Sequence, residues 1–200
     1  AYSPTPILSK SELSIICKEI IEPTINELIK RNIEYRGVLY FGLMITKSGP
    51  KVIEYNCRFG DPECQTIMPL MDTNFVNILY KCALGKLNGD EKVLSTSKVS
   101  GCVIAASRGY PENYEVGLPI TFKNVEFKDL QIFHSGTANN EKGEIVSAGG
   151  RVLSIVCQGD DFDSAFNNAY NALKEINFDG IYYRRDIGYQ VRENFSYEDK

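Results

Sequence analysis

Three polar residues, Glu54, Asn56 and Arg58, occupy alternate positions at the end of a stretch that begins at Lys51. In an extended strand successive side chains point to opposite faces, so these three groups are expected on one face. The same alternation places Val52 on that face and Ile53, Tyr55 and Cys57 on the other. Carboxylate and carboxamide oxygens are hard ligands and a guanidinium binds anions, which suits a Mg²⁺-bound polyphosphate. The row therefore predicts phosphoryl-transfer chemistry; the alternative is ordinary charge on a solvated strand face.

A polar loop follows this row and is expected to lead into a helix. Gly60 permits a tight turn, and Pro62 restricts Asp61 to an extended conformation and is well placed to open a helix at Glu63. On spacing alone, Asp61 is therefore first a helix-start residue and only second a substrate ligand. Both interpretations remain open at this point.

These residues also carry a family resemblance. Glu54-x-Asn56-x-Arg58 resembles the metal and phosphate row of ATP-grasp ligases. The run Arg-Phe-Gly-Asp-Pro-Glu-Cys-Gln-Thr, from Arg58 to Thr66, resembles the signature of one of their families, the glycinamide ribonucleotide synthetases (phosphoribosylamine–glycine ligases). The short row fits many ATP-grasp enzymes, so it indicates the superfamily, whereas the nine-residue run indicates the family. Later runs of this sequence resemble the carboxy-terminal domain of the same synthetases, so the resemblance extends to about residue 192.

The resemblance implies an α+β fold in two parts. Residues 1–96 are expected to form the second half of an ATP-grasp domain, an antiparallel sheet with flanking helices that carries the metal and phosphate site. Residues 97–192 are expected to form a small α+β carboxy-terminal domain, and residues 193–200 a tail or linker. A polar, aperiodic stretch from Lys86 to Thr96 favours a boundary there.

The resemblance further implies ATP-dependent joining of glycine to 5-phosphoribosylamine, which yields glycinamide ribonucleotide, ADP and phosphate through a glycyl phosphate. Glu54 and Asn56 are then expected to hold Mg²⁺ or Mn²⁺, with ATP as co-substrate, and Arg58 to act catalytically on the transferring phosphoryl group. Substrate contacts are expected from Asp61, Pro62, Glu63 and Arg151. In most ATP-grasp relatives the preceding strand adds an acidic ligand, but here that neighbourhood is Tyr40-Phe41-Gly42.

Two other functions stay open. One is an ATP-grasp ligase for another carboxylate and amine, and the other is a non-enzymatic nucleotide-binding module, which the missing acid near Gly42 favours. The chain begins without methionine, so we expect a piece of a longer, multifunctional purine-synthesis polypeptide. Its upstream part would supply the glycine-rich loop and lysines over the phosphates, so this chain alone is expected to be inactive.

Bulk properties exclude several classes of protein. With 200 residues, of which 43% are hydrophobic and 24% charged, the chain has the composition of an ordinary globular protein. A net charge of -4 without a long basic run argues against nucleic-acid and anionic-membrane partners. The six cysteines form no C-x-x-C pair and there is one histidine, so reduced thiols in a cytoplasmic protein are expected rather than a zinc site.

Periodicity predicts the elements that position the row. Ser9 and Glu12 form a capping-box pattern before a helix over residues 10–32, in which Pro23 predicts a kink. A hairpin is expected from residues 36–46 and 51–57, joined by a turn at 47–50. Helices are expected over 63–71, 74–87 and 162–176, and strands over 99–107, 130–135, 144–157 and 180–191. Phe75, Ile78, Leu79 and Leu84 are expected on the buried side of the second of these helices.

The second domain has polar clusters of its own. They lie at His134 to Thr137, at Gly149-Gly150-Arg151 and at Tyr183 to Gly188, the last within the expected final strand. A single histidine beside a turn is more often a hydrogen-bonded structural residue than a catalytic one. The paired glycines permit a bulge or close packing, and Arg185 and Asp186 are candidates for a surface ion pair.

Overall fold

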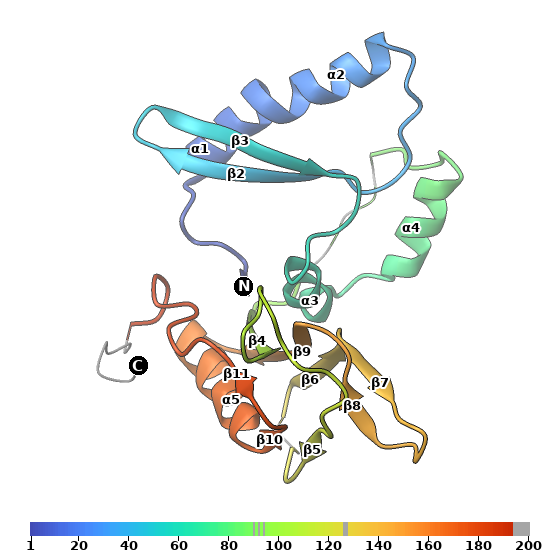
Figure 1. Ribbon diagram of the computed structural model, residues 1–200. Coiled ribbons are helices and arrows are strands. Elements are labelled where there is room, and N and C mark those ends of the chain that lie inside the picture. The colour runs from blue at the N-terminus through green and yellow to red at the C-terminus, as the bar shows by residue number, and fades with distance from the viewer. Residues whose placement is uncertain (90, 92, 94, 126–127, 194–200) are drawn as a thin grey trace. The chain divides into compact units, whose positions relative to one another are not determined.

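The computed structural model describes residues 1–89, 91, 93, 95–125 and 128–193, and its parts are drawn in Figure 1. The chain divides into two compact units. The hairpin unit comprises Thr5–Asp61 and Met71–Ser95, and the sheet unit comprises Ala1–Pro4, Pro62–Leu70 and the chain from Thr96 onward. Among the described residues, no helix is long and apolar enough to cross a membrane.

The hairpin unit begins with a helical segment that changes its winding. Helix α1 (Lys10–Ile16) passes into a π-helical turn, η1 (Cys17–Ile21), and then into α2 (Glu22–Lys30). The capping box is confirmed: the Ser9 amide donates to Glu12 Oε2 at 2.8 Å, and Glu12 N donates to Ser9 Oγ at 3.2 Å. The predicted kink takes the form of this wider turn, because Pro23 lacks the N–H that a continuous α-helix would use.

Two strands follow and form the predicted antiparallel hairpin, β2 (Tyr40–Thr46) with β3 (Gly49–Asn56). Helix α4 (Phe75–Ala83) is shorter than predicted, because Gly85 adopts a φ of 66° and ends the helical path. Asn74 caps it by accepting a hydrogen bond from Asn77 N at 3.1 Å. The predicted buried side of α4 is only partly right. Phe75 and Ile78 are half-buried, whereas Leu79 and Leu84 are 41% and 42% exposed.

The sheet unit is built on five antiparallel strands. Strand β4 (Val99–Ser107), which was predicted with these bounds, pairs with β9 (Arg151–Gly159), and β9 pairs with β6 (Leu130–His134). The other edge of β4 carries two short strands, β1 (Tyr2–Ser3) and β11 (Ile181–Tyr182). Tyr2 and Ser3, near the start of the chain, are therefore part of this sheet.

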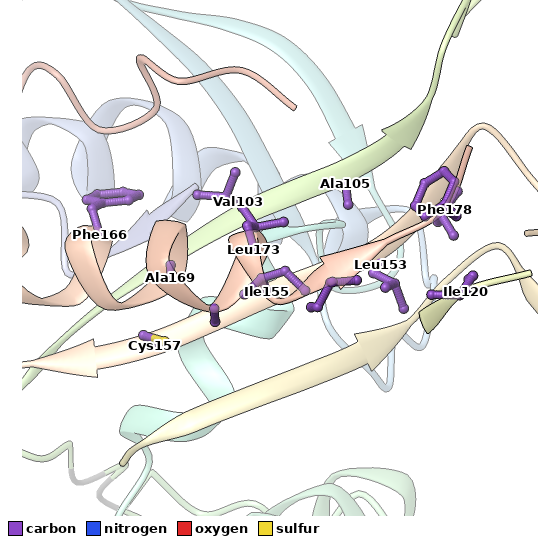
Figure 2. Packing of buried hydrophobic residues seen from close by; sticks show 13 residues of the cluster. Val103, Ala105, Ile120, Leu153, Ile155, Cys157, Phe166, Ala169, Leu173 and Phe178 are labelled. Atoms are coloured by element: carbon purple, nitrogen blue, oxygen red, sulfur yellow. The ribbon is translucent and has the colours of Figure 1, made fainter. Parts of the chain in front are cut away.

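One face of this sheet packs against α5 (Phe162–Lys174), as Figure 2 shows. Apolar residues recur at helical spacing on α5 and at every second position on the two central strands. The fully buried members are Phe166, Ala169 and Leu173 on α5, Val103 and Ala105 on β4, and Leu153, Ile155 and Cys157 on β9. Gly101 keeps room for α5, because a Cβ there would approach the Phe166 ring to 3.0 Å.

Smaller elements complete the sheet unit. Helix α3 (Glu63–Ile67) continues into a 3₁₀ turn, η2 (Met68–Leu70), and contacts β1, β4 and β9. Two short ribbons pair β5 (Thr121–Phe122) with β10 (Ile176–Asn177), and β7 (Thr137–Asn139) with β8 (Ile145–Ser147).

Two predicted strands were wrong in extent. The strand expected over residues 144–157 is split into β8 and β9, because residues 148–150 leave the ladder at the two glycines. The strand expected over residues 180–191 ends at Tyr182, and the Tyr183 to Gly188 cluster lies in a loop. The expected tail lies outside the described residues after residue 193.

Candidate active site

The polar row at the end of β3 owes its direction to a β-bulge. Counting back from the turn, Leu43 pairs with Val52, but Gly42 pairs with Glu54, so Ile53 is an extra residue in β3. An extra residue inverts the alternation beyond it, and bulges of this kind re-aim side chains. Val52 therefore lies on the face opposite Glu54, and its predicted place on the Glu54 face was wrong.

The hairpin register assigns each side chain to one of two faces. The Glu54 face carries Tyr40, Gly42, Met44, Lys51, Glu54 and Asn56, and the Tyr55 face carries Phe41, Leu43, Ile45, Val52 and Tyr55. The Tyr55 face lies against α2, where Tyr55 Oη is 3.3 Å from Thr24 Oγ1, and Val52 and Tyr55 line a hollow with residues of that helix. The helical segment that contains α2 therefore lies on the Tyr55 face, and Figure 1 shows this segment alongside the hairpin.

Glu54 and Asn56 are brought together on this face. The Asn56 side-chain amide donates to Glu54 Oε1 at 2.9 Å, and the Glu54 side chain is exposed. Their oxygen atoms are the donors that Mg²⁺ and Mn²⁺ prefer. Within the residues that the structure describes, no group of three or more His, Cys, Asp and Glu side chains is placed to hold a metal ion. The donor set therefore fits a divalent cation as two protein ligands, with the remaining positions left to phosphate oxygens and water.

Gly42 is a residue of this site that sequence reasoning treated only as a missing acid. A Cβ at position 42 would come within 2.8 Å of Glu54 Cγ and 3.6 Å of Glu54 Oε1. The absence of a side chain therefore makes room for the Glu54 carboxylate. Lys51 shares the Glu54 face of the hairpin. The hairpin pattern was visible in the sequence, but the bulge that sets these pairings was not.

Arg58 lies beyond the end of β3, in an exposed position. Its Nη1 donates to the carbonyl oxygen of Phe59 at 2.8 Å, and the Phe59 ring packs edge-on against Phe75 of α4 at 5.6 Å. This contact anchors the chain beside the guanidinium. Because an arginine has five N–H donors, the other donors of Arg58 are available to an anion.

Tyr35 interacts with Cys57, which lies between Asn56 and Arg58 in the sequence. The Tyr35 hydroxyl donates to the Val38 carbonyl at 2.7 Å, and burial, followed by a hydrogen bond with the Cys57 thiol, raises the pKa of Tyr35. Cys82 Sγ lies 3.9 Å from the Gly37 carbonyl oxygen. All six cysteines are free. Tyr35 was not singled out from the sequence, because no local motif links it to the row.

The loop after the row divides between the two units. Asp61 belongs to the hairpin unit, whereas Pro62 and Glu63 belong to the sheet unit, where Pro62 occupies the position before α3 and Glu63 is the first residue of the helix. The predicted helix start is therefore confirmed, although Pro62 and not Asp61 occupies the cap. Glu63 carries negative charge in the first turn, where the helix dipole favours it.

Arg151, in the sheet unit, begins β9 and pairs with Ala106 of β4. It lines a cavity of about 220 Å³ together with Tyr110, Tyr182 and Arg184. Gly150, directly before it, permits close packing, because a Cβ there would come within 2.0 Å of the Tyr110 ring. The close-packing interpretation of the paired glycines is therefore confirmed at Gly150.

The other polar clusters of the sheet unit have structural partners. His134 Nδ1 lies 3.0 Å from Thr137 Oγ1, as expected for a hydrogen-bonded histidine. The ion pair predicted between Arg185 and Asp186 was assigned to the wrong arginine. Arg184 forms it with two hydrogen bonds of 2.9 Å, which raise the pKa of Arg184. The final strand ends before these residues, so the alternation assumed for them does not apply.

Two family models match the chain. Residues 1–64 match the ATP-grasp (A) domain of phosphoribosylglycinamide synthetase, and residues 100–190 match the C domain of the same synthetase. Both models describe domains of one synthetase, and along this chain the match to the A domain precedes the match to the C domain.

Curated relatives agree with these matches. The chain is 44% identical over 193 residues to a phosphoribosylamine–glycine ligase of Nostoc sp., covering 96% of this chain and 45% of that protein. It is 41% identical over 192 residues to the trifunctional purine biosynthetic protein adenosine-3 of Gallus gallus, covering 96% of this chain and 19% of that protein. The chain thus spans less than half the length of the relatives it matches.

Solved structures agree on the fold. The phosphoribosylamine–glycine ligase of Thermotoga maritima superposes with a TM-score of 0.79 at 33% identity, over 92% of this chain and 45% of that one. The biotin carboxylase subunit of a pyruvate carboxylase superposes with a TM-score of 0.62 at 14% identity, over 91% and 39%. The second likeness shows the fold alone. The α+β fold, the second half of an ATP-grasp domain followed by a carboxy-terminal domain, is confirmed.

Proposed function

Because the chain belongs to the phosphoribosylglycinamide synthetase family, we propose that it is the carboxy-terminal part of an ATP-dependent ligase that joins glycine to 5-phosphoribosylamine. The products would be glycinamide ribonucleotide, ADP and phosphate. The observation that carries the proposal is the pairing of Glu54 and Asn56 on the same face of the hairpin. We also propose that residues 1–96 and 97–192 correspond to the two domains of the family, followed by a tail or linker.

Glu54 and Asn56 are proposed to hold Mg²⁺ or Mn²⁺. Both supply hard oxygen atoms, and Gly42 leaves the space that the Glu54 carboxylate needs. A bound divalent cation supplies charge neutralisation for the β- and γ-phosphate oxygens of ATP. The Asn56 amide nitrogen now donates to Glu54 Oε1, so an amide rotation would turn its oxygen toward a cation.

Arg58 is proposed to stabilise the γ-phosphoryl group during its transfer. Charge spreads over the equatorial oxygens of that group in the transition state, and a guanidinium donates to such oxygens with charge-assisted hydrogen bonds. The hydrogen bond from Arg58 Nη1 to Phe59 limits the freedom of the side chain. Arg58 would therefore be partly ordered before the nucleotide arrives.

The chemistry requires two steps in sequence. A carboxylate oxygen of glycine attacks the γ-phosphorus, the bond to the β-phosphate oxygen breaks, and ADP leaves with that electron pair. The amine of phosphoribosylamine then attacks the acyl carbon, phosphate leaves, and the amine loses a proton. Substrate contacts are proposed for Asp61, Pro62, Glu63 and Arg151. For Arg151 the supporting observation is that it lines a cavity in the sheet unit.

Full turnover is proposed for a longer polypeptide than this chain. The relatives are more than twice as long, and the chain matches 45% of the ligase from Nostoc sp.. We therefore propose that this chain works together with an upstream part of the same polypeptide. ATP, glycine and phosphoribosylamine are its proposed ligands. A cytoplasmic location belongs to the same proposal, which the six free thiols favour.

The proposal is tested by measuring ADP release from the polypeptide extended to the length of its relatives. ADP must appear only when ATP, glycine and freshly made phosphoribosylamine are all present, and the 200-residue chain alone must release none. If ADP release depends on a different acid or amine, the protein is an ATP-grasp ligase for another carboxylate and amine, and the proposed substrates are wrong. The missing acid opposite Glu54 favours a second candidate, a nucleotide-binding module without catalysis. Metal-dependent nucleotide binding without turnover in the extended protein would identify that module.

A further inference from the structure

A second candidate binding site lies in the sheet unit, beside α5, and the ligase proposal does not use it. It is a cavity of about 540 Å³, within the range of small-molecule sites. Among the described residues that line it, three are cationic, Lys174, Arg185 and Arg192, and none is acidic. We propose that this cavity, called here the α5 cavity, binds the phosphate of a nucleoside monophosphate.

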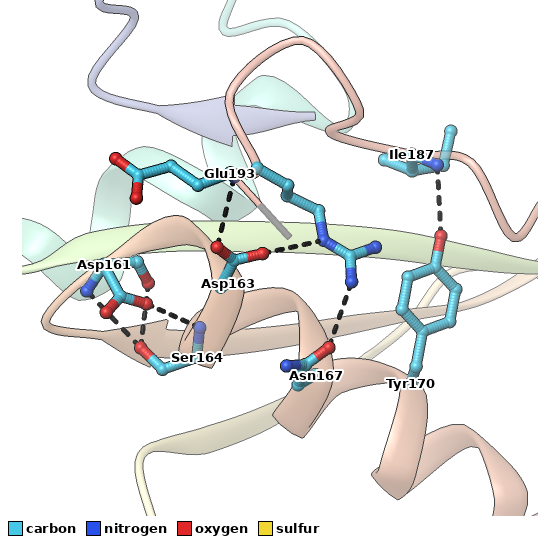
Figure 3. Close-up of polar contacts among 8 residues, drawn as sticks. Asp161, Asp163, Ser164, Asn167, Tyr170, Ile187 and Glu193 are labelled. Carbon is cyan, nitrogen blue, oxygen red and sulfur yellow. Dashed lines mark hydrogen bonds and ion pairs between the residues drawn. The ribbon is translucent and has the colours of Figure 1, made fainter. Parts of the chain in front are cut away.

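One wall of the α5 cavity is held to the helix by the hydrogen bonds of Tyr170. Tyr170 Oη donates to the Arg184 carbonyl at 2.9 Å and accepts from Ile187 N at 3.1 Å, so it ties α5 to the loop that carries Arg185. Figure 3 shows the tyrosine pointing from the helix to Ile187. A preformed wall lowers the entropic cost of binding.

Arg192 closes one side of the cavity and is held from several directions. Its Nη2 donates to Asn167 Oδ1 at 3.0 Å, and its Nε lies 3.6 Å from Asp163 Oδ1. The guanidinium carbon lies 5.9 Å from the centre of the Phe166 ring and 5.8 Å from that of Tyr170. Asp163 balances part of the charge, so Arg192 acts mainly as a positioned wall.

Arg185 and Lys174 supply the positive charge of the cavity that is not balanced by a neighbouring carboxylate. Asp186 is occupied by both hydrogen bonds from Arg184, and among the described residues neither Arg185 nor Lys174 has an acidic partner. Lys174 donates to Asn171 Oδ1 at 3.0 Å and also suits the carboxyl end of α5. Arg185 has no such second role. In a chain of net charge -4, this local excess of positive charge favours an anion.

The remaining lining distinguishes a nucleotide from a free anion. Tyr170 and Tyr183 pack with ring centres 6.3 Å apart, and both border the cavity. Aromatic rings stack with nucleobases, and the side-chain amides of Asn167 and Asn171 match the polar edges of a base or the hydroxyls of a ribose. A nucleoside monophosphate offers a phosphate to the cations, a ribose and base edge to the amides and a planar base to the rings.

The test measures binding of AMP to the 200-residue chain by calorimetry, with a chelator present so that metal-dependent binding near Glu54 does not contribute. AMP is expected to bind more tightly than inorganic phosphate or adenosine. Arg185→Glu is expected to weaken AMP binding by about tenfold or more, since it removes a charge-assisted hydrogen bond and adds repulsion. Lys142→Glu, the same charge change in an exposed turn of the sheet unit, is expected to leave binding unchanged.

Arg185→Lys keeps the charge and is expected to retain most of the affinity, which separates a lost ligand contact from a lost fold. The melting temperature of each variant checks the fold directly. The proposal is overturned if AMP does not bind, if Arg185→Glu binds AMP as well as the unsubstituted chain does, or if inorganic phosphate binds as tightly as AMP. Glu54→Gln separates this proposal from the ligase proposal. This variant is expected to bind AMP as the unsubstituted chain does, because Glu54 does not line the α5 cavity.

Discussion

Gly42 lies directly opposite Glu54 in the hairpin, and a Cβ at position 42 would approach Glu54 Cγ to 2.8 Å. The space that a side chain at position 42 would need is therefore filled by the Glu54 side chain. This pairing depends on the bulge at Ile53, because an unbroken ladder would place Ile53 opposite Gly42. The carboxylate and the glycine consequently form one structural feature.

Gly42→Ala is expected to destabilise the protein, because the added methyl group forces Glu54 or the strand to shift. The cost is expected at about 1–3 kcal/mol, as for other substitutions that overpack a close contact. Thermal unfolding followed by circular dichroism measures it. The control is Gly42→Ala combined with Glu54→Ala, which removes Cγ and is expected to recover most of the loss. Equal melting temperatures for the single variant and the unsubstituted chain would show that the contact is easily relieved.

Tyr170→Phe tests how the loop after β11 is held on α5. The substitution leaves the Ile187 N–H and the Arg184 carbonyl without the hydroxyl, at an expected cost of about 1–3 kcal/mol. Tyr114→Phe removes a hydroxyl with no hydrogen bond among the described residues and serves as the control. Urea unfolding measures both free energies. If the two variants lose the same amount, the Tyr170 hydroxyl does not anchor the loop.

Several elements followed from the sequence because their causes are local. The capping box at Ser9, the helix opened by Pro62 and strand β4 each depend on residues within one short segment. The polar row was also found this way, since Glu54 and Asn56 are two residues apart. Their shared face, the hairpin and the family resemblance could be predicted because each depends on residues close together in the sequence.

What the sequence did not predict depends on pairing between distant segments. The bulge at Ile53 reversed the face of Val52, and Gly42, an isolated glycine within the opposite strand, was the one local sign of it. Tyr2 and Ser3 form a strand only because β4 offers an edge far along the chain. The segment after Tyr182 has apolar and polar residues that suggested a strand, but the hydrogen bonds of Tyr170 and Arg184 hold it as a loop. Register and tertiary contacts override local pattern at these positions.

Cys157 gives a prediction about pH. Burial beneath α5 raises the pKa of its thiol to about 12, from an ordinary value of 9.0. Because the unfolded chain ionises first, the contribution of this thiol to stability is complete below pH 9 and is lost as the pH rises toward 12. Urea unfolding at neutral and alkaline pH is expected to show a smaller alkaline loss in Cys157→Val than in the unsubstituted chain.

The thiols also differ in access. Iodoacetamide is expected to modify the exposed Cys57 in the folded chain and to leave the buried Cys157 unmodified, as peptide mass spectrometry measures. Rapid modification of Cys157 at neutral pH without denaturant would contradict its burial. Identical alkaline losses in Cys157→Val and the unsubstituted chain would assign the effect to other groups.

The measurement that tests the central claim most directly is glycine-dependent ADP release from the extended polypeptide carrying Glu54→Gln, with Glu22→Gln as the control. Glu22 is an exposed carboxylate in the same hairpin unit, on α2. Glu54→Gln keeps the shape of the side chain and removes the charge proposed to hold the cation. We predict a fall in turnover of about a hundredfold or more for Glu54→Gln. Glu22→Gln is predicted to show no such change. Undiminished ADP release by Glu54→Gln would contradict the proposed metal role of the Glu54 and Asn56 pair.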